Sequence, residues 1–276
     1  MFAKTLFAKP SLMAAGIAVG LATLVPSAAE AHRRWLLPSM TTYSGESAIA
    51  SVDAAASNEL FLFEHRPMRL DELVITGPDG QPVKPEIIGT GELRSVFDVP
   101  LTKQGTYRIA VAGSGMMGTY EINGERRRFR GGANQLPEGA TNVRMSENSS
   151  RTETFVTLGA PNDTALKPTG SGLEMIPVTH PNDLIAGEPA QMRFLLDGQP
   201  AANLEVEFVE GGTRYRDNPG IQTLTTDADG MLTLTASEAG MYYLETSQGG
   251  GRPDEGESDG PSRRASYTAV LEFMPL

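Results

Sequence analysis

The side chains best suited to chemistry in this chain are its three histidines, His32, His65 and His180. Neutral imidazole is a common ligand of nickel, copper and zinc in proteins. The strand-forming segment 60–65 predicts a strand that ends at His65, two residues before Pro67, and His180 lies directly before Pro181. Both histidines are therefore expected where a strand ends or a loop begins. If the three converge, they form a nitrogen-rich metal site. The alternative is that each histidine caps a turn or packs locally.

His32 has a further feature, because residues 1–31 have the pattern of a cleavable export signal. Lys4 and Lys9 precede an uncharged apolar run over 12–25, and a small-x-small motif ends at Ala31. Cleavage after Ala31 makes His32 the first residue, whose α-amine and imidazole can chelate one ion. The alternatives are a retained membrane anchor, for which the run is short, and a frayed end without function.

Composition excludes several classes of protein. The chain has 276 residues, no cysteine and a net charge of −11, which becomes −12 once Lys4, Lys9 and Glu30 are removed with the signal. Disulfides, thiolate metal sites and cysteine nucleophiles are therefore excluded. The acidic balance disfavours nucleic acid and anionic membranes as partners and favours cations. Export without cysteine indicates a periplasmic location, with no stable membrane insertion after cleavage.

The mature chain has the pattern of an all-β protein. Short runs rich in Val, Ile, Thr, Tyr and Phe end at Gly, Pro, Asn or Asp, and Asp-Gly pairs supply tight turns. The runs are 73–76, 107–111, 204–209, 231–235, 242–246 and 265–273. We predict two β-sandwich domains in tandem after the signal peptide, at 32–165 and 170–276. A repeated "DGQP", at 79–82 and 197–200, supports two copies of a related unit.

Other motifs point less clearly to chemistry. The basic stretch Arg126–Arg130 lies between glycines, which is typical of an exposed hairpin, and it either binds phosphate or a partner or is simply solvated. Met116 and Met117 are either soft copper(I) ligands or core residues. There is no nucleophile elbow, phosphate loop or dinucleotide fingerprint. We therefore expect no catalytic residues and no enzymatic activity.

The chain also resembles a bacterial periplasmic family of unknown function. The segments that carry the resemblance are "AHRRWLLPS", "LFLFEHRPMRLDELVITGPDG", "GTYRIAV" and, near the C-terminus, "AGEPAQMRFLLDGQPAANLEVEFVEGG" and "TLTTDADGMLTLTASEAGMYYLE". Some members are described as periplasmic components of ABC-type nickel or cobalt uptake systems. The second half also resembles carboxypeptidase-regulatory-like and transthyretin-like sandwiches.

The resemblance implies metal handling, with His32 and His65 as the informative matches and His180 less secure. We accordingly expect a divalent transition-metal-binding protein, for nickel, cobalt or copper, with His32, His65 and His180 as ligands and a membrane transporter component as a partner. One alternative is a non-enzymatic sandwich module for interaction or scaffolding. A further one is a copper-dependent oxidative enzyme in which the terminal histidine and a second histidine hold the copper; such enzymes usually also present surface aromatics, and Trp35 is the one tryptophan of this chain.

Overall fold

A computed structural model of the chain describes residues 32–249 and 262–276. These residues form strands, turns and short 3-10 helices, without an α-helix among them, so the predicted all-β class is confirmed. No helix in the described ranges is long and apolar enough to cross a membrane. The expected export signal over 1–31 lies outside the described residues.

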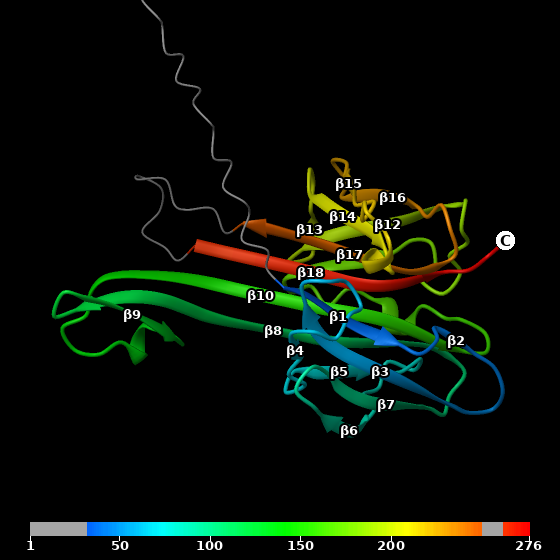
Figure 1. The fold of residues 1–276 in the computed structure, drawn as a ribbon, viewed down its shortest axis with the longest axis horizontal. Helices are drawn as coiled ribbons and strands as arrows, with labels where there is room; N and C mark the ends of the chain where they lie inside the picture. Colours follow the sequence, from blue (N-terminus) through cyan, green and yellow to red (C-terminus); the bar gives the residue numbers. More distant parts are fainter. Residues whose placement is uncertain (1–31, 250–261) are drawn as a thin grey trace, which may run out of the picture. The chain divides into compact units, whose positions relative to one another are not determined.

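The described strands form three sheets, of which the largest has nine strands (Figure 1). Its order is β15-β14-β17-β18-β10-β8-β5, with β2 added to β10 and β9 to β8. The bounds are β2 Thr42–Tyr43, β5 Leu73–Thr76, β8 Gly105–Ile122, β9 Glu125–Arg130, β10 Thr141–Leu158, β14 Glu205–Glu210, β15 Gln222–Thr225, β17 Gly240–Gly249 and β18 Ser262–Phe273. β10 and β18 run parallel, so strands from both halves of the chain share this central sheet.

Two smaller sheets complete the sandwiches. The N-terminal outer sheet has the order β1-β3-β7-β6, with β4 paired to β3, and the C-terminal outer sheet has the order β11-β12-β13, with β16 paired to β12. The bounds are β1 Arg33–Pro38, β3 Ala48–Ser57, β4 Arg66–Pro67, β6 Glu86–Thr90, β7 Ser95–Leu101, β11 Leu173–Pro177, β12 Pro189–Leu196, β13 Gln199–Pro200 and β16 Met231–Thr235. The 3-10 helices are η1 Ala133–Gln135, η2 Thr164–Leu166 and η3 Thr213–Tyr215.

Side chains alternate across the central sheet, so the sheet has a core on each face. Phe155 of β10 belongs to a cluster with Phe194, Phe208 and Tyr267, on the side of the C-terminal outer sheet. The next residue, Val156, belongs to a cluster with strands of the N-terminal outer sheet. The β-sandwich architecture is thus present as two sandwiches that use one central sheet.

A third apolar cluster joins the two halves. Trp35 of β1 and Leu60 pack with Val209, Tyr243 and Val270 from the C-terminal strands. The described residues belong to one compact unit. Because Trp35 is fully buried in this cluster, the start of β1 is held firmly against the central sheet, and this fixes the position of the adjacent His32.

Candidate functional site

His32 and His65 reach the same place from two strands that flank β3. The register pairs Arg33 of β1 with Ser57, and it pairs Arg66 of β4 with Ala56. Each histidine therefore lies beside the C-terminal end of β3, one residue outside the paired region. Two of the three histidines selected from the sequence are brought together in this way.

The two imidazoles are in direct contact. Their ring centroids are 3.7 Å apart and the ring planes are tilted by 38°. His32 Nδ1 lies 2.7 Å from Asn58 Oδ1, and because an amide oxygen only accepts, Nδ1 carries the proton and donates. The unprotonated nitrogen of a neutral His32 is then Nε2. His65 is exposed and His32 half-buried, so the pair is open to solvent.

The loop between β3 and β4 holds His65 in place, although the sequence favoured a strand there. Leu60 is buried, and Phe61 has a positive φ of 60°, a conformation that no strand residue adopts. The Phe61 ring packs edge-on against Trp35, with ring centroids 5.8 Å apart. The Arg94 guanidinium stacks on the Phe63 ring, with its carbon 4.6 Å from the ring centroid. The expected strand over 60–65 is therefore wrong, because its aromatic side chains fill the cluster around Trp35 instead of pairing with a neighbouring strand.

A shallow cavity of about 540 Å³ opens beside this loop. Glu59, Glu64, Arg214 and Arg216 contribute charged groups to its lining. The carboxylates already have partners, since Glu64 Oε1 accepts from the Glu59 amide at 3.1 Å and Glu59 Oε2 accepts from Thr213 Oγ1 at 3.4 Å. In the described ranges, no group of three or more His, Asp or Glu side chains is arranged to hold a metal ion. The histidine pair is therefore a two-ligand site as far as side chains are concerned.

His180 lies elsewhere, in a closed hydrogen-bond network. Its Nδ1 accepts from the Asn182 amide at 3.2 Å, and its Nε2 lies 2.9 Å from Thr106 Oγ1. Thr157 Oγ1, 2.9 Å from Thr106 Oγ1, donates to Asn182 Oδ1 at 2.8 Å. Burial lowers the pKa of His180 below its usual range, which favours the neutral form that this network requires.

The network and the histidine pair lie at opposite ends of β1. Thr157 of β10, which pairs with Thr106, also pairs with Thr42, beyond the C-terminal end of β1. His32 precedes the first residue of β1, and six strand residues alone span about 20 Å. The predicted convergence thus holds for His32 and His65, while the structure does not place His180 with them.

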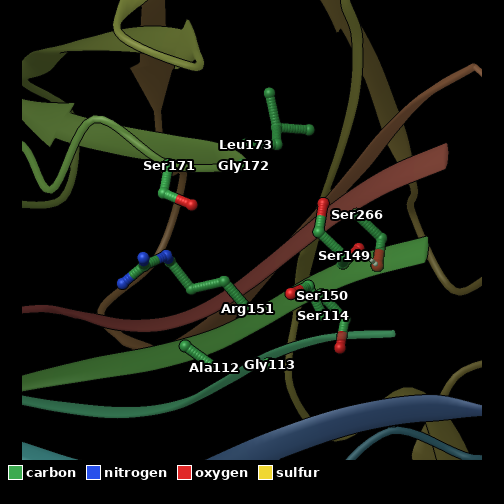
Figure 2. Close-up of a pocket in the computed structure, with 10 residues that line it drawn as sticks. All are labelled: Ala112, Gly113, Ser114, Ser149, Ser150, Arg151, Ser171, Gly172, Leu173 and Ser266. Atoms are coloured by element: carbon green, nitrogen blue, oxygen red, sulfur yellow. Dashed lines mark hydrogen bonds between the residues drawn. The ribbon is translucent and has the colours of Figure 1, made fainter. Parts of the chain in front are cut away.

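A second, polar cavity of about 170 Å³ lies between β10, β18 and the start of β11 (Figure 2). Ser149, Ser150 and Ser266 contribute to its wall, and the Ser149 hydroxyl is buried without a partner among the described residues. The Arg151 guanidinium extends away from these serines and donates to Glu153 at 3.0 Å and Thr169 at 2.9 Å. Because Arg151 is already ion-paired with Glu153, this cavity has the character of a small polar void.

In a comparison with known protein families, residues 29–250 match a domain of unknown function (DUF4198). The chain belongs to the DUF4198 family. The matched region includes both histidines of the pair and all of β1 to β17. No curated protein matches this DUF4198 chain.

Among solved structures, the DUF4198 chain is similar to two fragments of intimin. The D0-D1 domain has 10% sequence identity, with 87% of this chain and 97% of that chain covered, at a TM-score of 0.21. The D00-D0 domain has 10% identity, with 88% and 100% covered, at a TM-score of 0.20.

One residue of the site was not selected from the sequence. Asn58 follows the last residue of β3, in a stretch without any motif. Its partner His32 is 26 positions away, so only the pairing of β1 with β3 reveals the contact. The sequence offered one indirect signal for Asn58: a polar residue directly after the Ala-rich run of β3 marks the end of that strand.

Proposed function

We propose that this DUF4198 protein binds a divalent transition metal ion, nickel, cobalt or copper, and buffers or delivers it in the periplasm. The observation that carries the proposal is the contact between the imidazoles of His32 and His65. Two neutral imidazoles suit all three ions, with copper held most tightly and cobalt least. The net charge of −11 also favours cations over anions.

Asn58 supports a specific form of the site. Histidine ligands commonly donate their second ring N–H to a fixed acceptor, which sets the tautomer and the ring orientation. Asn58 Oδ1 takes this role for Nδ1 of His32. Nε2 of His32, together with a ring nitrogen of His65, is then available to one ion.

Removal of residues 1–31 adds a further donor. A chain that starts at His32 has a free α-amine beside the imidazole pair. Chelation by this amine and Nδ1 of the same residue requires the hydrogen bond to Asn58 to break, whereas binding through Nε2 leaves it intact. With two imidazoles and at most one amine, the remaining ligands come from solvent or from a partner, which suits an ion that is taken up and passed on.

The burial of Trp35 removes this residue as a binding face for an oxidative enzyme. A copper enzyme acting on polysaccharide needs exposed aromatic side chains next to its copper. Trp35, the one tryptophan of the chain, is fully buried under the loop of Phe61 and Phe63. We accordingly assign no reaction to the site.

The test is a calorimetric titration of the processed protein with Ni²⁺, Co²⁺ and Cu²⁺ separately. We expect one ion per chain. Loss of a residue that only hydrogen-bonds to a metal ligand lowers the affinity about 10- to 100-fold, and we expect H65A, which removes a ligand itself, to lower it further. H180Q is the matched control, because it removes an imidazole outside the pair and should leave affinity within about twofold. Equal affinities of wild type and H65A would refute the proposal.

A second titration uses a processed chain with one extra residue before His32. Binding through the imidazoles alone is unaffected by this extension, whereas chelation by the α-amine is weakened because the amine is moved away. The result therefore assigns the third donor without testing the imidazole pair again.

One observation favours the alternative function of an interaction module. β6 is the last strand of the N-terminal outer sheet, and all five of its residues are exposed, including Ile87 and Ile88. An exposed edge with apolar side chains is the usual template for an added strand of a partner. Retention of function by a protein lacking both His32 and His65 would favour this alternative.

A further inference from the structure

The ends of β8 and β10, together with β9, form an arm that extends past the rest of the central sheet (Figure 1). We define the arm as residues 115–146. β10 pairs with β18 from Ser146 onward, and among the described residues the part of β10 before Ser146 pairs with β8. The eight residues of β8 from Gly115 to Ile122 span about 27 Å.

The strand register gathers arginines on one face of the arm. Directly opposed residues of antiparallel strands share a face. Arg128 of β9 is opposite Thr119 of β8, and Thr119 is opposite Arg144 of β10. Arg126 and Arg130 lie two residues to either side of Arg128 and so share its face. The basic face consists of Arg126, Arg128, Arg130 and Arg144, all of them exposed.

The intervening residues of β9 lie on the opposite face. Phe129 contacts Tyr120 with ring centroids 6.0 Å apart, and Arg127 pairs with Glu125 at 2.9 Å. The basic face therefore contains no aromatic side chain. Its apolar contribution is Met117, which is opposite Arg130 and 44% exposed.

The charge of the arm is opposite to that of the rest of the chain. Residues 115–146 contain five arginines and three glutamates, for a net charge of +2, while the whole chain carries −11, so the remainder carries −13. On the basic face itself the acidic residue is Glu121, whose carboxylate accepts from Asn142 at 2.6 Å. The arm is thus a local exception to the acidic surface that the composition predicts.

We propose that the basic face of the arm docks on a lipid bilayer surface that carries anionic phospholipid phosphates. Guanidinium groups bind phosphate in bidentate fashion, and arginines two residues apart on one strand are about 7 Å from each other, which suits an extended anionic surface rather than one small ligand. Protein interfaces are anchored by buried aromatic side chains, and here Tyr120 and Phe129 pack on the other face. The flexible, exposed Met117 fits among lipid headgroups.

The length of the arm allows this docking despite the acidic remainder. Exposed charges are screened over about 8 Å at physiological salt, and the arm extends about 27 Å. The outer end of the basic face, Arg126 opposite Glu121, lies six residues beyond Gly115, or about 20 Å from the base of the arm, which is more than two screening lengths. The proposal does not depend on metal binding by His32 and His65.

The test is co-flotation of the processed protein with phosphatidylcholine vesicles that contain or lack phosphatidylglycerol. We expect binding only to the anionic vesicles, with strong weakening as the screening length falls to about 3 Å at 1 M salt. Each arginine near such a surface contributes about fivefold to partitioning, so the double variant R128Q/R144Q should bind about 30-fold more weakly.

R127Q is the matched control, because Arg127 is the sequence neighbour of Arg128 and lies on the opposite face. It should reduce binding by less than about twofold, against about fivefold for R128Q. Equal losses for the two variants, or equal binding to neutral vesicles, would overturn the proposal. Salt-dependent self-association without vesicle binding would also overturn it, and would identify a second copy of the chain as the partner. Thermal unfolding of each variant confirms that the fold is intact.

Discussion

Substitution of Asn58 separates the two ways in which His32 can bind a metal. Asn58→Ala removes the acceptor that lies 2.7 Å from Nδ1 of His32. If the ion binds Nε2, the ring loses its fixed orientation and tautomer, and affinity should fall about 10- to 100-fold, or about 1.4 to 2.7 kcal/mol. If the ion is chelated by the α-amine and Nδ1, the substitution frees Nδ1 and affinity should rise.

The size of the effect can be separated from any loss of folding. Asn58 is exposed and lies outside the strands, so its truncation should change the free energy of unfolding by less than about 0.5 kcal/mol. N58D is the second variant, because a carboxylate accepts from Nδ1 more strongly than an amide and should hold or increase the affinity for binding through Nε2.

The assay is calorimetry with Ni²⁺ and Cu²⁺ on the processed forms of wild type, N58A and N58D, with urea unfolding of each. The expected order of affinity is N58D at or above wild type, and wild type above N58A. An N58A protein that binds more tightly than wild type would refute binding through Nε2. Identical affinities of all three would show that the bond to Asn58 has no part in the site.

Three further predictions concern the rest of the fold. Because burial lowers the pKa of His180, its contribution to stability is present above about pH 6.5 and is lost as the pH falls through the lower, folded-state value; the thermal midpoint of H180Q should therefore depend less on pH than that of wild type as the pH falls below about 6.5. Glu174 is 1% exposed and accepts three hydrogen bonds at 2.8 to 2.9 Å, so E174A should lower the free energy of unfolding in urea by about 2–4 kcal/mol; a loss below about 1 kcal/mol would contradict this account. Gly230 has a φ of 74°, and an added Cβ would approach the carbonyl oxygen of Phe194, so G230A should cost more than about 1 kcal/mol by the same measurement, and an unchanged midpoint would count against it.

Apart from the segment 60–65, the strands that the sequence predicted are present, because each prediction needed only a short run of residues suited to a strand and an adjoining turn. The runs at 73–76 and 231–235 coincide with β5 and β16. Asp197 and Gly198, both with positive φ, form the expected tight turn. The lengths of the strands were less accessible, since β8 continues from the predicted 107–111 to Ile122, through a Gly- and Met-rich stretch with little strand propensity.

Local sequence could predict one property of the site, namely that its histidines lie at the ends of strands. His65 and His180 were both expected at such ends, and both are. Which ends lie together depends on pairing between distant strands, and here β3 brings His65 to His32 while the pairing around Thr157 holds His180 at the far end of β1. Composition likewise gave the acidic net charge but not the separation of four arginines onto one face, which is a property of the register.

The position of β18 between β10 and β17 has a consequence for how the polypeptide acquires its structure. Thr152 and Thr268, which are hydrogen-bonded across β10 and β18, are 116 positions apart. Closing so long a segment costs chain entropy before any contact repays it, and parallel pairing at such distance folds slowly. The nine-stranded sheet therefore cannot close until residues 262–273 are available, and a chain synthesised only as far as β17 keeps the β18-facing edge of β10 unpaired.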